Sequence, residues 1–300
     1  MDLLRLEAPR TRCTVAPEAG GRLLQLEIRP GDGTWLPLLL APDDPGRAVA
    51  EPMAWGSFVM APWPNRIAAG AFTYDGARYD VPPNLDGHAA HGVAFDRPWR
   101  VEGASERGCV LSVRFDERWP FGGGATQRLT LLDNGVEQRI DVHSDGRAFP
   151  AGAGWHPWFR RDVRPGAEPR VLIDAGEMYE ARAMIPTGAL LPVAGESDLR
   201  AGPELGDRRL DTCYPYGPSG PHPQGALWVR WGDIELTIAS SANVRHAVVY
   251  TPARAFCVEP QTCAIDAFNL DARGLAAGVT VVAPGRPLVA STTWRWRLHP

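Results

Sequence analysis

The stretch QRLTLLDNGVEQRIDVHSDG, residues 127–146, carries the pattern that decides the fold. Polar and apolar residues alternate on both sides of Asp133-Asn134-Gly135, as they do in strands with one buried face. Asn-Gly is a strong hairpin signal, because tight hairpin turns need positive φ at their central positions. The stretch therefore predicts two antiparallel strands joined by a tight turn.

The same signals recur along the chain. The stretch from Cys13, CTVAPEAGGRLLQLEIRPGDGTWLPLLL, consists of short apolar runs separated by GG and GDG, and another alternating pair surrounds Asp75-Gly76. Strand-like runs continue to the final WRWRL. Residues 266–277 are the one stretch expected to form a short helix, and residues 197–225 are expected to be a long, Pro-rich loop.

Composition supports an all-β fold. The chain contains 32 glycines and 29 prolines among 300 residues, spread along its length, and many short strands joined by turns need this composition. A hydrophobic content of 44% suits one sizeable core, and β-sandwiches reach this length without splitting. We therefore expect a single domain over residues 1–300.

Charge and motifs exclude several classes of protein. The net charge of −4, without a run of basic residues, argues against nucleic acid as a partner. Five scattered cysteines do not suggest a disulfide framework, and MDLLRLEAPR lacks the features of a signal peptide, so we expect a cytoplasmic protein that does not bind membranes. No GxGxxG, P-loop, nucleophile elbow or CxxC occurs, which predicts no nucleotide cofactor.

A histidine among aromatic residues is the first candidate for chemistry. In AGAGWHPWFR, residues 151–160, His156 lies next to Trp155, Trp158 and Phe159, and Pro157 stiffens the backbone. An imidazole in an aromatic slot suits proton delivery to a hydroxyl-rich ligand. The alternative is a core histidine with one satisfied hydrogen bond.

Residues 61–67, APWPNRI, form the second candidate. Pro62 and Pro64 prevent regular strand pairing, which predicts that Asn65 and Arg66 lie on a rigid, irregular segment. A guanidinium beside an aromatic ring can hold several sugar oxygens at once. Alternatively, Arg66 is a surface charge that lies over the ring of Trp63.

Three further residues complete the set. His88 and His91 are three apart, but no other metal ligands follow at zinc-like spacing, so a hydrogen-bonding role for His91 is more natural than a metal site. Asp211 lies in the 197–225 loop, as a sugar contact or as a turn-stabilising residue. Glu259 follows an apolar strand, where desolvation raises the pKa of a carboxyl and makes it a plausible base; an exposed or salt-bridged glutamate is the alternative.

Five motifs in order resemble the aldose 1-epimerase, or galactose mutarotase, family, and the resemblance covers nearly the whole chain. The motifs are PWPNRI (62–67), HG (91–92), GWHPWF (154–159), LDTCY (210–214) and VEPQT (258–262). The resemblance implies a single large antiparallel β-sandwich with a monosaccharide in a cleft across one sheet, and no metal or other cofactor.

The resemblance also implies roles for individual residues. Glu259 would remove the proton of the anomeric hydroxyl and His156 would protonate the ring oxygen. The other matched positions would orient the sugar, with an aromatic ring stacked on its face. They are Asn65, Arg66, His91, Asp211 and Trp158.

Two departures from the family pattern affect the expected substrate. Trp158 stands where many relatives have Tyr, and GVAFDRPW follows the HG motif in place of the usual run. A non-catalytic sugar-binding or regulatory protein, an epimerase for a sulfonated or phosphorylated hexose, and a glycosidase that pairs Glu259 with Asp211 or Asp266 stay as alternatives. We expect a monomer or a homodimer.

Overall fold

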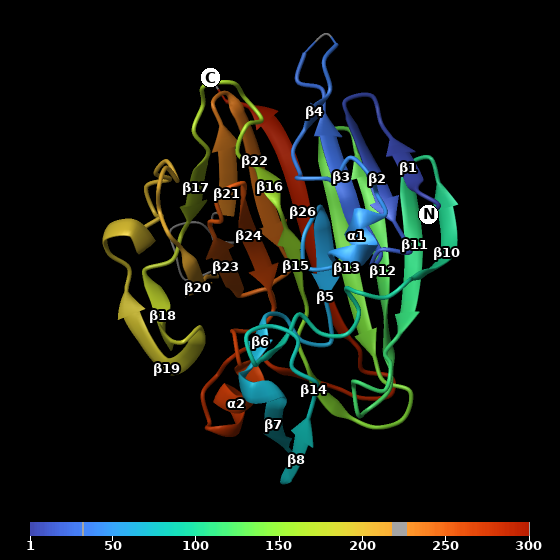
Figure 1. Cartoon of the computed structure of the whole chain (residues 1–300), viewed down its shortest axis with the longest axis vertical. Coiled ribbons are helices and arrows are strands. Elements are labelled where there is room, and N and C mark those ends of the chain that lie inside the picture. The colour runs from blue at the N-terminus through green and yellow to red at the C-terminus, as the bar shows by residue number, and fades with distance from the viewer. Residues whose placement is uncertain (32, 218–226, 300) are drawn as a thin grey trace.

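The computed structural model describes residues 1–31, 33–217 and 227–299. Most of the described chain forms antiparallel strands arranged in two large sheets (Figure 1). The first sheet has the strand order β1 (Leu4–Glu7), β2 (Thr11–Ala16), β3 (Arg22–Ile28), β5 (Ser57–Met60), β15 (Gly154–Pro157), β24 (Ala255–Gln261), β23 (His246–Tyr250) and β20 (Asp211–Pro215). In addition, β4 (Leu36–Pro37) pairs with β3, and β16 (Phe159–Arg160) pairs with β24.

The second sheet covers one face of the first. Phe159 of β16 packs against two tryptophans of this sheet, Trp231 and Trp294, with ring centroids 5.9 and 5.5 Å away. Buried side chains from both sheets form one hydrophobic cluster. The order of the second sheet is β10 (Arg100–Ser105), β11 (Gly108–Arg114), β12 (Gly124–Leu132), β13 (Gly135–His143), β26 (Leu288–Leu298), β22 (Ile234–Ser240), β21 (Leu227–Trp231) and β17 (Arg170–Ile173).

Short elements lie at the ends and sides of the sandwich (Figure 1). The strand pairs are β6 (Arg66–Ile67) with β9 (Ala89–Ala90), β7 (Ala71–Tyr74) with β8 (Ala77–Asp80), β14 (Phe149–Ala151) with β25 (Thr280–Val282), and β18 (Glu177–Arg182) with β19 (Ile185–Pro192). The helices are α1 (Arg47–Ala50) and α2 (Ala267–Ala272), with 3-10 turns η1 (Ala68–Gly70) and η2 (Gly195–Ser197). Within the described residues, no helix combines the length and the apolar character that crossing a membrane requires.

The predicted antiparallel β-sandwich is confirmed, and so is the hairpin at residues 133–135. Leu132 pairs with Gly135, which leaves a two-residue turn between β12 and β13. Burial alternates along both strands, as the sequence pattern predicts. A side chain at position 135 would collide with the backbone, because a Cβ there would lie 1.9 Å from the carbonyl oxygen of Trp294. Glycine therefore permits the close approach of β26.

Three local predictions are wrong. Residues 211–215 are not loop but strand β20, because they pair with β23 and extend the first sheet, while residues 218–225 of the predicted loop lie outside the described residues. Arg66 does not lie on unpaired backbone. Arg66 and Ile67 follow Pro62 and Pro64 in the sequence and pair with β9. The stretch 266–277 does contain α2, but it is not the only helix, since residues 47–50 form α1. The single domain over residues 1–300 stays a prediction.

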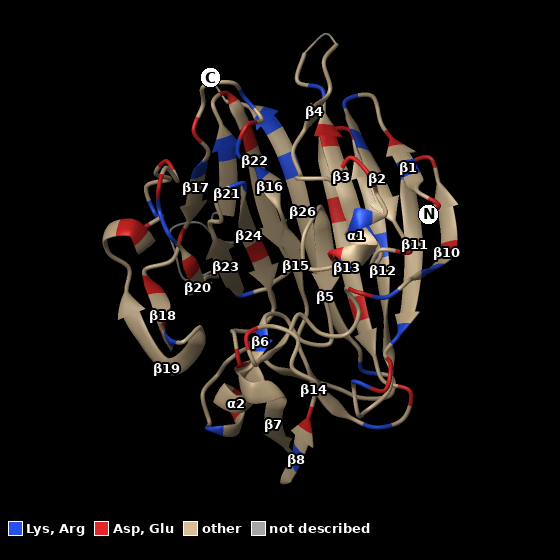
Figure 2. Ribbon diagram, in the orientation of Figure 1, with Lys and Arg blue, Asp and Glu red and all other residues tan. Residues whose placement is uncertain are grey.

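Charged residues of both signs are interspersed along the strands in the view of Figure 2. Neighbouring strands and turns carry ion pairs such as Arg12–Glu27, at 2.8 Å, and Arg139–Asp141, at 2.8 Å. Such exposed pairs contribute little to stability. The face of the first sheet that points away from the core is different, because its polar groups are buried around a cavity.

Candidate active site

Two neighbouring strands place a histidine beside a glutamate. His156 lies on β15 and Glu259 on β24, and the Nε2 atom of His156 is 3.2 Å from the Oε1 atom of Glu259. Both side chains are buried, with exposed fractions of 6% and 2%. Glu259 lies inside a fully buried strand and not after its end, which corrects the prediction from sequence.

Burial determines the charge of this pair. Burial, followed by the neighbouring His91, lowers the pKa of His156 well below its usual value. Burial, followed by the negative charge of Asp211, raises the pKa of Glu259 well above its usual value. Both effects favour the uncharged form, since low-dielectric surroundings disfavour charge. These directions favour a neutral imidazole beside a protonated carboxyl, and the 3.2 Å contact lets a proton pass from one residue to the other.

His156 is sandwiched between two aromatic rings. Its ring stacks on Phe58 with centroids 4.7 Å apart and on Trp158 with centroids 5.4 Å apart. Trp155, which the sequence also suggested as a wall of the slot, is completely buried in the core between the sheets. Successive side chains of a strand point to opposite faces, so the residue directly before His156 cannot share its pocket.

Asn65 organises the polar side of the site. It adopts a left-handed conformation with φ of 51°, which Asn tolerates better than most residues. Its Oδ1 atom accepts hydrogen bonds from the backbone N–H of Arg66, at 2.9 Å, and from the Arg66 guanidinium, at 3.4 Å. Its carbonyl oxygen accepts the N–H of His91. Asn65 thus holds two other predicted site residues in place.

Arg66 and Asp211 face each other across the cavity. The Nη1 atom of Arg66 is 3.9 Å from Oδ2 of Asp211, which is too long for a hydrogen bond. Burial raises the pKa of Asp211, and the charge of Arg66 opposes this shift. The buried Nε of Arg66 has no partner among the described residues. The two side chains therefore keep hydrogen-bonding capacity for a ligand.

His91 lies edge-on to His156, with ring centroids 5.1 Å apart. Its Nδ1 atom is 3.1 Å from the sulfur of Met60. Burial, followed by the charge of Arg66, lowers the pKa of His91 to about 3, so it is neutral at physiological pH. The following Gly92 is required because a Cβ there would lie 2.0 Å from the carbonyl oxygen of Ala61.

A cavity of about 750 Å³ joins these residues. Its lining includes all seven residues that the sequence predicts, namely Asn65, Arg66, His91, His156, Trp158, Asp211 and Glu259. Ten further lining residues were missed. They are Glu51, Pro52, Met53, Ala54, Asn84, Leu85, Asp86, Phe95, Asp96 and Tyr250.

Most of the missed residues lie on irregular segments, where residue type alone gives no signal. Tyr250 is an exception, because it pairs with Asp211 across β23 and β20, and a correct assignment of β20 would have revealed it. The unusual run after the HG motif, residues 92–99, was a signal, and it contributes Phe95 and Asp96.

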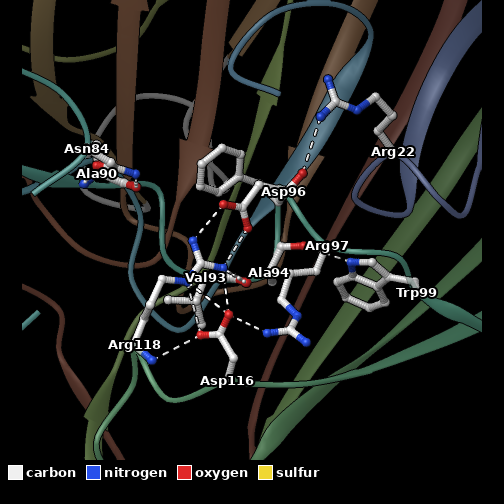
Figure 3. Close-up of polar contacts among 11 residues, drawn as sticks. Arg22, Asn84, Ala90, Val93, Ala94, Asp96, Arg97, Trp99, Asp116 and Arg118 are labelled. Atoms are coloured by element: carbon white, nitrogen blue, oxygen red, sulfur yellow. Dashed lines mark hydrogen bonds and ion pairs between the residues drawn. The ribbon is translucent and has the colours of Figure 1, made fainter. Parts of the chain in front are cut away.

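An arginine that belongs to a loop of the second sheet holds residues 92–99 in place (Figure 3). Arg118, in the loop between β11 and β12, donates to both carboxylate oxygens of Asp96, at 2.6 and 2.8 Å, and to the carbonyl of Val93. It also binds Asp116, which pairs with Arg97. The segment after Gly92 is therefore held by arginine side chains together with backbone hydrogen bonds to Ala61, Pro17 and Gly20.

One group of side chains in the described residues has the composition of a metal site. Ligand atoms of His156, Cys257 and Glu259 lie within 4.8 Å of one another, and nitrogen, sulfur and oxygen ligands of this kind suit zinc. A metal ion here would occupy both His156 and Glu259. His88 is used elsewhere, since its Nδ1 atom accepts the N–H of Ala69 at 3.1 Å.

Comparisons with known proteins agree with this architecture. The family model described as aldose 1-epimerase matches residues 2–293. Uncharacterized protein YihR of Escherichia coli (strain K12) is 24% identical over 238 residues, which are 75% of each chain.

Two solved structures show the same fold. The GalM/aldose epimerase homologue from C. elegans has a TM-score of 0.86 and 20% identity, covering 100% of this chain and 99% of that one. Galactose 1-epimerase from Lactobacillus acidophilus NCFM has a TM-score of 0.80 and 16% identity, covering 99% of this chain and 95% of that one.

Proposed function

We propose, because this chain belongs to the aldose 1-epimerase family, that it interconverts the α and β anomers of a free aldose. Mutarotation removes a proton from the C1 hydroxyl and adds one to the ring oxygen, so that the bond between C1 and O5 breaks. One base and one acid are sufficient. The buried contact between His156 and Glu259, at 3.2 Å, is the observation that carries the proposal.

The two reacting oxygens share one carbon, so acid and base can act from neighbouring positions. Glu259 takes the proton of the C1 hydroxyl while protonated His156 gives its proton to O5. Rotation about the bond between C1 and C2 then exposes the other face of the carbonyl, and the roles reverse during ring closure. The pair holds the same single proton before and after the reaction.

The remaining predicted residues would bind and orient the sugar. Arg66, His91 and Asp211 present donors and acceptors to hydroxyl groups, while Asn65 positions Arg66. Trp158 offers an aromatic face beside His156.

Glu259→Gln tests the assignment of the base. The rate of mutarotation of freshly dissolved α-glucose or α-galactose, followed by polarimetry, should fall about 10²- to 10⁴-fold. Sugar affinity, measured by calorimetry, should change little because the amide is isosteric. An unchanged rate in this variant would remove Glu259 as the base.

A panel of sugars separates this proposal from its rivals. A protein that only binds sugar would not raise the rate of anomer exchange above the spontaneous rate. A glycosidase would use Asp211 as the second carboxylate and would release reducing ends from a disaccharide. Asp266 is less suited to that role, because it accepts the N–H of Ala68 at 2.8 Å and an N–H of Asn269 at 2.7 Å.

The same panel identifies the sugar. Glucose, galactose, arabinose and xylose should be compared with a sulfonated and a phosphorylated hexose. By the resemblance to the aldose 1-epimerase family, the dipeptide His156-Pro157 favours an unphosphorylated aldose. Cytoplasmic localisation and a monomeric or homodimeric state stay predictions.

A further inference from the structure

A buried arginine behind the cavity has no role in the preceding mechanism. Arg22 is the first residue of β3, and its exposed fraction is 0%. Within the described chain, no carboxylate forms an ion pair with it. A buried charge without a counter-ion is costly, so its surroundings must compensate by other means.

Five backbone carbonyls compensate for this charge. The Nε atom donates to Ala19, Nη1 to Ala54 and Trp55, and Nη2 to Pro52 and Phe95. A guanidinium has five N–H groups, so every donor is used. Lysine has three donors, and no other side chain could replace all five bonds.

The acceptors belong to the wall of the cavity. Pro52, Ala54 and Phe95 line it directly, and they come from two segments that are far apart in sequence. Arg118 holds the second of these segments at Asp96 and Val93, and Figure 3 shows Arg118 and Arg22 approaching it from different directions. Arg22 thus ties both wall segments to the first sheet.

The guanidinium also ends a column of stacked rings. Its central carbon lies 5.4 Å from the centroid of Phe58, and Phe58 stacks on His156. Trp158 covers the other face of the imidazole. Arg22 therefore also supports the aromatic ring that packs against His156.

We propose that Arg22 is a positioning residue of this site, which holds both wall segments in place through its five carbonyl bonds and supports Phe58, the ring that stacks on His156. The inference rests on the proposed function for its consequences in catalysis. It predicts an effect on sugar binding.

Arg22→Gln and Arg22→Lys test the anchoring. Both lose carbonyl bonds, so KM should rise on the order of 10-fold in each while kcat changes little. Arg78→Gln, at an exposed arginine that does not line the cavity, is the matched control and should leave both constants unchanged.

Sugar affinity, measured by calorimetry, supplies a readout that does not need catalysis. The dissociation constant of the sugar should be higher in Arg22→Gln than in the wild type. If the wild type binds sugar but does not catalyse, the proposed function fails while this affinity still tests Arg22. Equal affinity and KM in Arg22→Gln and the wild type, or a loss confined to kcat, would overturn the proposal.

A measurement on the wild type covers the case in which the variants do not fold. The Nε–H of Arg22 is bonded to Ala19 at 2.5 Å inside the protein, so its hydrogen exchange should be much slower than that of exposed arginines such as Arg78. Exchange at the rate of an exposed arginine would show that the anchor does not exist.

Discussion

The floor and the rim of the cavity are built in different ways. The floor, which we define as His156 and Glu259, lies on β15 and β24 inside the first sheet. The rim, which we define as lining residues 51–54, 84–86 and 95–96, lies on irregular segments. Strand pairing positions the floor. Arginine side chains bound to carbonyls and carboxylates hold residues 51–54 and 95–96 of the rim, whereas hydrogen bonds to His88 and Ala90 hold Asn84.

This difference separates chemistry from recognition. Proton transfer requires fixed geometry, and a regular sheet supplies it because neighbouring backbones are locked in register. Irregular segments tolerate changes of sequence, so they can adapt to different sugars without moving the acid–base pair. Changes in the floor should therefore affect kcat, and changes in the rim should affect KM and sugar preference.

The largest effect is expected at the floor. His156→Gln should lower kcat about 10²- to 10⁴-fold in the polarimetric assay, with a small change in KM. Because the two residues share one proton, combining this change with Glu259→Gln should cost little more than the worse single change. Fully additive losses would show that the two residues act independently.

A smaller effect on kcat/KM is expected for Arg66, which belongs to neither the floor nor the rim. Arg66→Met removes a guanidinium 3.9 Å from Asp211 and should lower kcat/KM about 10- to 100-fold, mainly through KM. Initial rates over a range of sugar concentrations measure this split. Arg78→Met, on the exposed hairpin of β7 and β8, is the control and should leave both constants unchanged. A loss confined to kcat would show that Arg66 acts in proton transfer, as the floor residues do, and not in sugar binding.

His246 is a buried histidine outside the cavity. It tests whether protonation away from the floor changes stability without changing activity. Burial lowers the pKa of His246 to about 4, so the unfolded chain binds a proton more readily below pH 6.5. Stability should fall as pH decreases from about 6.5, by about 2 kcal/mol at pH 5 from this residue. His246→Gln should reduce the pH dependence of urea unfolding and leave the kcat/KM profile in place. A shifted activity profile would contradict this separation.

The smallest expected effect concerns the metal-like ligand set at the floor. Zinc should inhibit by binding His156, Cys257 and Glu259, and Cys257→Ser should raise the half-inhibiting concentration on the order of 10-fold. A chelator should leave the activity of the untreated protein unchanged. Equal zinc sensitivity of variant and wild type would mean that zinc binds elsewhere.

The sequence by itself determined the fold class and seven of the residues that line the candidate site. Alternating residues around Asp133-Asn134-Gly135 require strands and a tight turn, because side chains point alternately to core and solvent. The five motifs named seven residues that line one cavity. Such signals are local, so they can be read without coordinates.

Only the tertiary structure decided how these residues face one another. It placed Trp155 in the core and Phe58 beside His156, moved Asp211 from a loop to an edge strand, and put Glu259 within a strand. Arg22 gave no local signal, because its partners are carbonyls of distant segments. Burial, stacking and proton sharing arise between segments far apart in the chain, and no local pattern records them.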